Sequence, residues 1–139
     1  MFRSFAAFLA VLILFTITSA QASQTQPDPT GVAAAQQFLV TLDNQEFLSA
    51  WNQTGIVNQS YQTYPEWFKK VLAVRPHLGQ ALSRVFEKHS EHSAWVGLPD
   101  GEYLRISFAT SFLNKAEALE TVVLVKEQGE WLVSAYFLR

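Results

Sequence analysis

The spacing of the apolar residues changes near Gly79, and this change constrains the fold more than any other feature of the chain. Before Gly79, as along residues 32–42, apolar side chains recur at intervals of three and four residues, which is the period of an amphipathic helix. After Gly79, as along residues 103–108, apolar and polar side chains alternate, which is the period of a half-buried strand. The sequence therefore predicts helices followed by a sheet.

Two helices are expected before residue 56. The first begins at residue 30 or 31 and continues to Leu42, and a short second helix contains Phe47–Trp51. Gly55 is a natural end for the second helix, because glycine favours the conformation that terminates helices. Residues 56–62 are expected to form a loop.

A third helix is expected after this loop. Thr63 and Glu66 have the spacing of a capping box, in which the two side chains bond to the free amides at a helix N-terminus. Pro65 fits the first turn, where its missing amide would have no partner in any case. Pro76 is expected to end the helix near Arg75.

Four antiparallel strands are expected after Gly79. Their ranges are 82–96, 103–108, 118–126 and 131–138. The intervening segments Gly97–Gly101 and Gln128–Glu130 contain the residues that tight turns prefer. Helices that precede an antiparallel meander predict an α+β fold, with the helices packed on one face of a curved four-stranded antiparallel sheet.

The first 22 residues have the three parts of a secretory signal peptide. Arg3 provides a positive charge, Phe5–Phe15 is an unbroken apolar run, and Ala20-Gln21-Ala22 is a cleavage pattern that predicts removal after Ala22. The apolar run is too short for a membrane-spanning helix, which needs about 20 residues. Residues 23–31 are expected to be a flexible tether, and residues 32–139 a single α+β domain.

The protein is therefore expected to be periplasmic or secreted, with no stable membrane insertion after cleavage. The chain has no cysteine, which excludes disulfides, cysteine nucleophiles and a lipid-anchored N-terminus. An exported chain without disulfides is more typical of a bacterial envelope than of an animal extracellular space. A formal net charge of −2 without basic runs argues against nucleic acid as a partner.

No pattern in the sequence identifies a catalytic centre, a metal site or a cofactor site. His89 and His92 would point to opposite faces of a strand, so we do not expect them to share a metal ion. No Gly-x-Ser-x-Gly elbow occurs, and the six glycines are too scattered for a phosphate-binding loop. The prediction is that the protein has no metal and no cofactor.

Isolated charges in the apolar second half are the strongest candidates for a functional site. Arg105, Lys115 and Glu120 lie in or beside predicted strands, and a buried charge without a partner is costly. We expect Glu120 to pair with Arg105 or Lys115 and, together with Tyr103 or Tyr136, to form the floor of a binding pocket. The alternatives are a structural ion pair or the solvent face of the sheet.

Ordered motifs in the second half resemble those of the domain-of-unknown-function 4019 family. They are Pro99-Asp100-Gly101-Glu102-Tyr103, Phe108-x-Thr110-x-Phe112-x-Asn114-Lys115, Glu120-Thr121-Val122 and Gly129-x-Trp131-x-Val133-x-x-Tyr136-Phe137. Trp51, Trp67 and Arg75-x-x-Leu78-Gly79 match the first half, so the resemblance covers Val32–Arg139. Ser134-Ala135 stands where the family pattern has Ala-Gly.

This resemblance implies an exported bacterial protein of undetermined activity. The order of helices and strands is also similar to that of the nuclear transport factor 2-like superfamily, which implies a cone-like sheet with a pocket between helix and sheet. Likeness of fold alone does not imply a function.

Three functions are consistent with these observations. The absence of a catalytic motif favours a non-enzymatic module that binds a small apolar ligand or an envelope protein. The second is a pocket enzyme of isomerase or dehydratase type, with Glu120 as the base and Tyr136 or Tyr103 as the proton donor. The third is a structural or assembly role as a homodimer. An enclosed cavity around a lone carboxylate would favour the enzyme.

Overall fold

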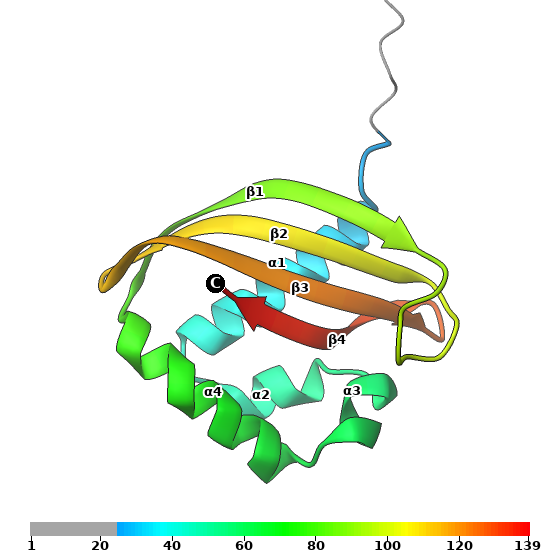
Figure 1. The fold of residues 1–139 in the computed structure, drawn as a ribbon, viewed down its shortest axis with the longest axis horizontal. Coiled ribbons are helices and arrows are strands. Elements are labelled where there is room, and N and C mark those ends of the chain that lie inside the picture. Colours follow the sequence, from blue (N-terminus) through cyan, green and yellow to red (C-terminus); the bar gives the residue numbers. More distant parts are fainter. Residues whose placement is uncertain (1–24) are drawn as a thin grey trace, which may run out of the picture.

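The computed structural model describes residues 25–139, in which four helices precede four strands (Figure 1). The expected signal peptide, residues 1–22, and its cleavage site lie outside this range. The helices are α1 (Pro29–Asp43), α2 (Phe47–Asn52), α3 (Ile56–Tyr61) and α4 (Tyr64–Leu78). The strands are β1 (Ala81–His92), β2 (Tyr103–Phe112), β3 (Lys115–Glu127) and β4 (Glu130–Leu138). Within residues 25–139, no helix is both long and apolar enough to cross a membrane.

The four strands form one antiparallel sheet in the order β1-β2-β3-β4. Strands β1 and β4 are its edges, and the sheet is neither closed nor strongly curled (Figure 1). The predicted α+β architecture is confirmed, whereas the expected cone-like shape is wrong. The helical layer extends past β4 (Figure 1), so the apolar face of the sheet is covered without the sheet wrapping around a helix.

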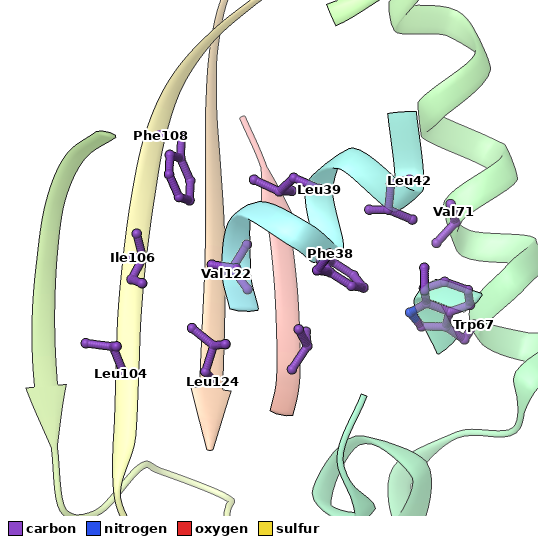
Figure 2. Packing of buried hydrophobic residues seen from close by; sticks show 13 residues of the cluster. Phe38, Leu39, Leu42, Trp67, Val71, Leu104, Ile106, Phe108, Val122 and Leu124 are labelled. Atoms are coloured by element: carbon purple, nitrogen blue, oxygen red, sulfur yellow. The ribbon is translucent and has the colours of Figure 1, made fainter. Parts of the chain in front are cut away.

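Helix α1 covers the inner face of the sheet and lies at the centre of the core. Its residues Phe38, Leu39 and Leu42 are at most 1% exposed. They pack between the sheet and the side chains of Trp67 and Val71, which point from α4 toward α1 (Figure 2). The facing sheet residues are Leu104, Ile106, Phe108, Val122 and Leu124. The helical and strand periods in the sequence therefore identify the two sides of this core correctly.

Helix α1 begins at Pro29, inside the range expected to be a tether. The Asp28 carboxylate caps it by accepting hydrogen bonds from Thr30 N at 2.9 Å and Thr30 Oγ1 at 2.6 Å. The same carboxylate accepts a bond from Trp131 Nε1 at 3.0 Å. Because Trp131 lies in β4, the sheet helps to determine where the helix begins.

Helix α3 occupies a range that the sequence predicts to be a loop. Its N-terminus is capped from the end of β3, because the Glu127 carboxylate accepts bonds from Ile56 N at 3.2 Å and Val57 N at 3.3 Å. A carboxylate there satisfies free amides and interacts favourably with the helix dipole. This cap comes from a residue distant in sequence, so the local pattern does not reveal it.

Helix α4 begins with the predicted capping box, in which the Glu66 carboxylate accepts a bond from Thr63 N at 2.7 Å. It continues through Pro76 to Leu78, beyond the predicted end at Arg75. A proline in the last turn removes only one main-chain bond, so the turn persists. Gly79, with a φ of 72°, ends the helix, as expected for a residue without a β-carbon.

The strands differ from the prediction mainly at their ends. Strand β1 stops at His92, earlier than expected, whereas β2 continues to Phe112 and β3 begins at Lys115. The β1–β2 register shifts near residues 81–83 and 86–88. Such irregularities interrupt the alternation on which a prediction of strand length depends.

Candidate functional site

A network of four charged side chains and one tyrosine, all buried or partly buried, lies beside the apolar core. Each of its members comes from a different element, and the following paragraphs call these five residues the buried ion network. They are Asp43 of α1, Arg75 of α4, Arg84 of β1, Glu120 of β3 and Tyr136 of β4.

Glu120 is at the centre of the network and is fully buried. Its Oε1 accepts hydrogen bonds from Arg84 Nε at 3.0 Å and Arg84 Nη2 at 2.8 Å. Its Oε2 accepts bonds from the Tyr136 hydroxyl at 3.0 Å and Arg75 Nη1 at 3.4 Å. Both carboxylate oxygens therefore have partners, as a buried charge requires.

Asp43 joins the same two arginines from α1. Its carboxylate pairs with Arg75 and with Arg84, whose Nη1 lies 2.7 Å from Oδ2 and whose Nη2 lies 3.1 Å from Oδ1. The Arg75 guanidinium also lies 5.3 Å from the centre of the Phe112 ring, within the range of a cation–π contact. Two carboxylates and two guanidinium groups make the network formally neutral.

The network changes the titration of Arg84 and Tyr136. Burial disfavours the charged form of Arg84, but the hydrogen bond to Asp43 and the charge of Glu120 outweigh burial and raise the pKa of Arg84. Burial and the negative charge of Glu120 raise the pKa of Tyr136. Arg84 therefore remains charged and Tyr136 remains protonated near neutral pH.

Of the five residues expected to form a polar pocket, the structure brings only Glu120 and Tyr136 together. Arg105 is paired with Val123 in the β2–β3 ladder, whereas Glu120 is paired with Phe108. Because Arg105 and Phe108 are three residues apart on one strand, their side chains point to opposite faces. The predicted pair between Glu120 and Arg105 is therefore wrong.

The other two expected residues also lie away from Glu120. Tyr103 shares the face of Arg105, and its hydroxyl donates a hydrogen bond to Pro99 O at 2.6 Å. Lys115 is the first residue of β3 and is paired with Phe112 at the β2–β3 turn. The cations that pair with Glu120 are Arg75 and Arg84 instead, so the predicted pair with Lys115 is also wrong.

A sequence signal for Arg75 existed, but none for Arg84. Trp67, Val71, Arg75 and Leu78 are the buried residues of α4 and recur at helical spacing. A cation on an apolar helical stripe indicates a buried partner. Strand β1, by contrast, is mostly exposed, and Arg84 is covered only because its partners come from other elements.

Two hollows lie beside the network, and Arg75 lines both. The α1–α4 cleft has a volume of about 530 Å³ and is lined by residues 42–45, Phe47, Leu72, Arg75, Pro76 and residues 79–81. The α4–β4 groove has a volume of about 390 Å³ and is lined by Asn58, Gln62, Trp67, Lys70, Val71, Val74, Arg75 and residues 134–138. Both volumes lie in the usual range of small-molecule sites.

At the polar end of the α4–β4 groove, three side chains are hydrogen-bonded in series, and the lysine at one end determines the direction of each bond. Lys70 Nζ can only donate, and it donates to Gln62 Oε1 at 2.8 Å. The amide nitrogen of Gln62 therefore faces Asn58 and donates to Asn58 Oδ1 at 2.7 Å. This leaves Asn58 Nδ2 buried without a hydrogen-bond partner.

The walls of the groove are apolar and partly uncovered. Val74 of α4 is 42% exposed and Phe137 of β4 is 53% exposed. Strand β4 is an edge of the sheet, and only its first half is covered, where Val133 N and O bond to Gln53 O and Gly55 N. The groove therefore combines unburied apolar surface with one unsatisfied donor.

The histidines do not contribute to either hollow. The His92 ring lies edge-on to Trp95, with their centres 4.7 Å apart, and its Nε2 is 2.9 Å from Ser90 Oγ. Across residues 25–139, no group of three or more histidine, cysteine, aspartate or glutamate side chains is arranged to hold a metal ion.

Comparison with known proteins identifies a family. The family model described as "Protein of unknown function (DUF4019)" matches residues 34–136, which includes α4, the whole sheet up to Tyr136 and all five residues of the buried ion network. No curated protein and no solved structure gives a significant match. The family resemblance inferred from the motifs is confirmed, and the chain belongs to the DUF4019 family.

Proposed function

We propose that this protein is an exported, non-enzymatic binding module and that its ligand occupies the α4–β4 groove. The observation that supports this proposal is the free donor, Asn58 Nδ2, which is buried without a partner beside the groove. Buried polar groups are nearly always hydrogen-bonded, and leaving one unsatisfied costs about 1–3 kcal/mol. A ligand acceptor that reaches this amide, with a small rotation of Asn58, removes that cost.

The buried ion network supports a structural role for Glu120 over an enzymatic one. A general base needs an oxygen that can reach the proton of a substrate, but both oxygens of Glu120 already accept bonds from Arg75, Arg84 and Tyr136. Glu120 does not line the α4–β4 groove. The α1–α4 cleft is a weaker candidate, because the charges of Asp43 and Arg75 on its wall are paired with each other.

Native mass spectrometry of the protein purified gently from the cell envelope, after expression of the full chain, tests this function. We expect the folded protein to carry additional mass from a non-covalently bound ligand, which is lost on denaturation. We also expect a polypeptide that begins at Ser23. The same spectra give the oligomeric state and therefore test the alternative that the protein acts as a homodimer.

Two matched variants locate the binding site. Val74→Trp fills the groove from α4, whereas Val40→Trp places the same side chain on α1, where Val40 is 45% exposed. The bound mass, or binding of the apolar dye 1-anilinonaphthalene-8-sulfonate, should be lost in Val74→Trp and kept in Val40→Trp. Equal binding by both variants would contradict the assignment to the groove.

A further inference from the structure

We propose that the ligand of the α4–β4 groove is a small apolar carboxylate of the medium-chain fatty acid type. This inference rests on the proposed function. It places the carboxylate at Asn58 and Lys70 and the hydrocarbon chain against Val71, Val74 and Phe137.

The polar end of the groove has free donors and, among the residues that the structure describes, no charged acceptor. Lys70 has three N–H groups, of which one is used on Gln62 Oε1, and Asn58 has its free Nδ2. Each amide oxygen on this chain already accepts one bond, since Gln62 Oε1 bonds to Lys70 and Asn58 Oδ1 bonds to Gln62. A ligand head group that only accepts hydrogen bonds fits these donors, and an ionised carboxylate is such a group.

In the described part of the chain, the polar end of the groove is lined by the cation of Lys70 and by no carboxylate. Within residues 25–139, no carboxylate oxygen lies within 4 Å of Lys70 Nζ. Glu66, one turn earlier on α4, is bound to Thr63 N at 2.7 Å and Thr63 Oγ1 at 2.9 Å. Arg75, the other cation of the groove, is neutralised inside the buried ion network. Lys70 therefore supplies one positive charge for an anionic head group.

The rest of the groove fits a hydrocarbon chain. Val71 and Trp67 line it from α4, and Val74 and Phe137 keep about half of their side-chain surface exposed. The volume of about 390 Å³ corresponds to about a dozen groups of the size of a water molecule, at ~30 Å³ each. A methylene is of similar size, so a carboxylate of about ten carbons fills the groove.

An extended peptide is the main competing occupant, because the second half of β4 is an open edge. Leu119 and Arg139 exchange two main-chain bonds of 3.1 Å, so the main-chain groups of Arg139 point toward β3. Main-chain groups point to alternate sides along a strand, and those of Tyr136 and Leu138, three positions and one position before Arg139, therefore point away from β3. A strand could bond there. The neutral main chain of a peptide, however, makes no use of the positive charge of Lys70, and we therefore favour the carboxylate.

Isothermal titration of the exported protein with octanoate, decanoate, 1-octanol and octylammonium tests the head group and the chain separately. We expect decanoate to bind about fifteenfold more tightly than octanoate, since each buried methylene contributes about fourfold. Octanoate should bind at least tenfold more tightly than 1-octanol, and octylammonium should not bind. An extended peptide that binds while decanoate does not would overturn the inference.

Variants on α4 assign the head group. Lys70→Met keeps the aliphatic stem and should weaken octanoate binding at least tenfold while leaving 1-octanol unchanged. Lys69→Met, an exposed neighbour that does not line the groove, is the matched control and should bind octanoate as the unmodified protein does. Asn58→Leu should also weaken octanoate binding, provided that its circular dichroism shows a folded protein. Lys70→Met tests the position of the carboxylate independently, because Lys70 is exposed and its substitution does not disturb the core.

The outcomes separate this inference from the proposed function. If octanoate and 1-octanol bind equally and Lys70→Met changes neither affinity, the proposal that the ligand is a carboxylate is wrong. Loss of binding in Val74→Trp would still support the groove as the binding site. If Val74→Trp binds every apolar probe as well as Val40→Trp does, the groove is not the binding site and both proposals fail.

Discussion

Replacing Glu120 by glutamine tests whether the buried ion network stabilises the fold. The substitution keeps the size and shape of the side chain, so it creates no cavity. It removes one negative charge from a neutral set, which leaves Arg75 and Arg84 with the single carboxylate of Asp43. It also places an amide N–H₂ where an oxygen now accepts bonds from Arg84 or from Arg75 and Tyr136.

The expected loss follows from the burial of this site. Glu120 is fully buried, and removing one partner of a buried ion pair costs about 3–5 kcal/mol because the other charge stays buried. A domain of this size has a free energy of unfolding of about 5–15 kcal/mol, so Glu120→Gln should be folded but much less stable. With a urea m-value of ~2 kcal/mol/M, the unfolding midpoint should fall by about 2 M.

Urea unfolding followed by tryptophan fluorescence measures this change. Glu117→Gln is the matched control, because Glu117 lies on the same strand but is exposed; its free energy of unfolding should stay within about 0.5 kcal/mol of the unmodified protein. A loss below about 1 kcal/mol in Glu120→Gln, with an unchanged m-value, would refute the reasoning.

A second variant separates the charge imbalance from other effects. Arg84→Gln combined with Glu120→Gln leaves Asp43 and Arg75 as a neutral pair, so the double variant should lose less than the sum of the two single losses, by about 1–3 kcal/mol.

Three further predictions concern the ends of helices. Gly79→Ala should lower the free energy of unfolding by about 1–3 kcal/mol in urea unfolding, because Gly79 has a φ of 72° and an added β-carbon would lie 3.1 Å from neighbouring side chains. Thr63→Ala should lower it by about 1 kcal/mol through loss of the α4 cap, and a thermal melt identical to that of the parent would contradict this. Hydrogen bonds from Thr30 and Trp131 lower the pKa of Asp28 from 3.8 to about 2. The stabilisation that they provide should be complete above pH 4 and be lost as pH falls toward 2; Asp28→Asn should lack this part of the acid dependence in unfolding experiments between pH 2 and 5.

The buried ion network adjoins the α4–β4 groove at helix α4. Arg75 belongs to the buried ion network and lines the α4–β4 groove, and it is held by Asp43 and Glu120. These ion pairs fix the position of α4 relative to the sheet, because they join it to α1 and β3. The network therefore gives the groove a stable shape, although its charges are not available to a ligand.

Local features of the sequence were sufficient for several parts of the fold. The alternation through Leu104, Ile106 and Phe108 correctly indicates the face of β2 that packs on α1, although Tyr103 and Ser107 on the other face are buried as well. The Thr63–Glu66 spacing correctly locates the start of α4. The motifs were sufficient to assign the family. Each of these inferences depends on residues within a few positions of one another, where helix and strand periods or capping bonds act.

The candidate site depended on contacts that no local pattern contains. The ion pairs of Arg75 join residues 32 and 45 positions apart, and those of Arg84 join residues 41 and 36 positions apart. The sequence indicated that Glu120 needs a partner, but only the packing of α1, α4 and β1 against the sheet decided which cations reach it. The same packing caps α3 with Glu127 and leaves Asn58 Nδ2 without a hydrogen-bond partner. Periodicity indicates which face of an element packs on the main core, whereas the tertiary structure alone determines which buried polar groups meet.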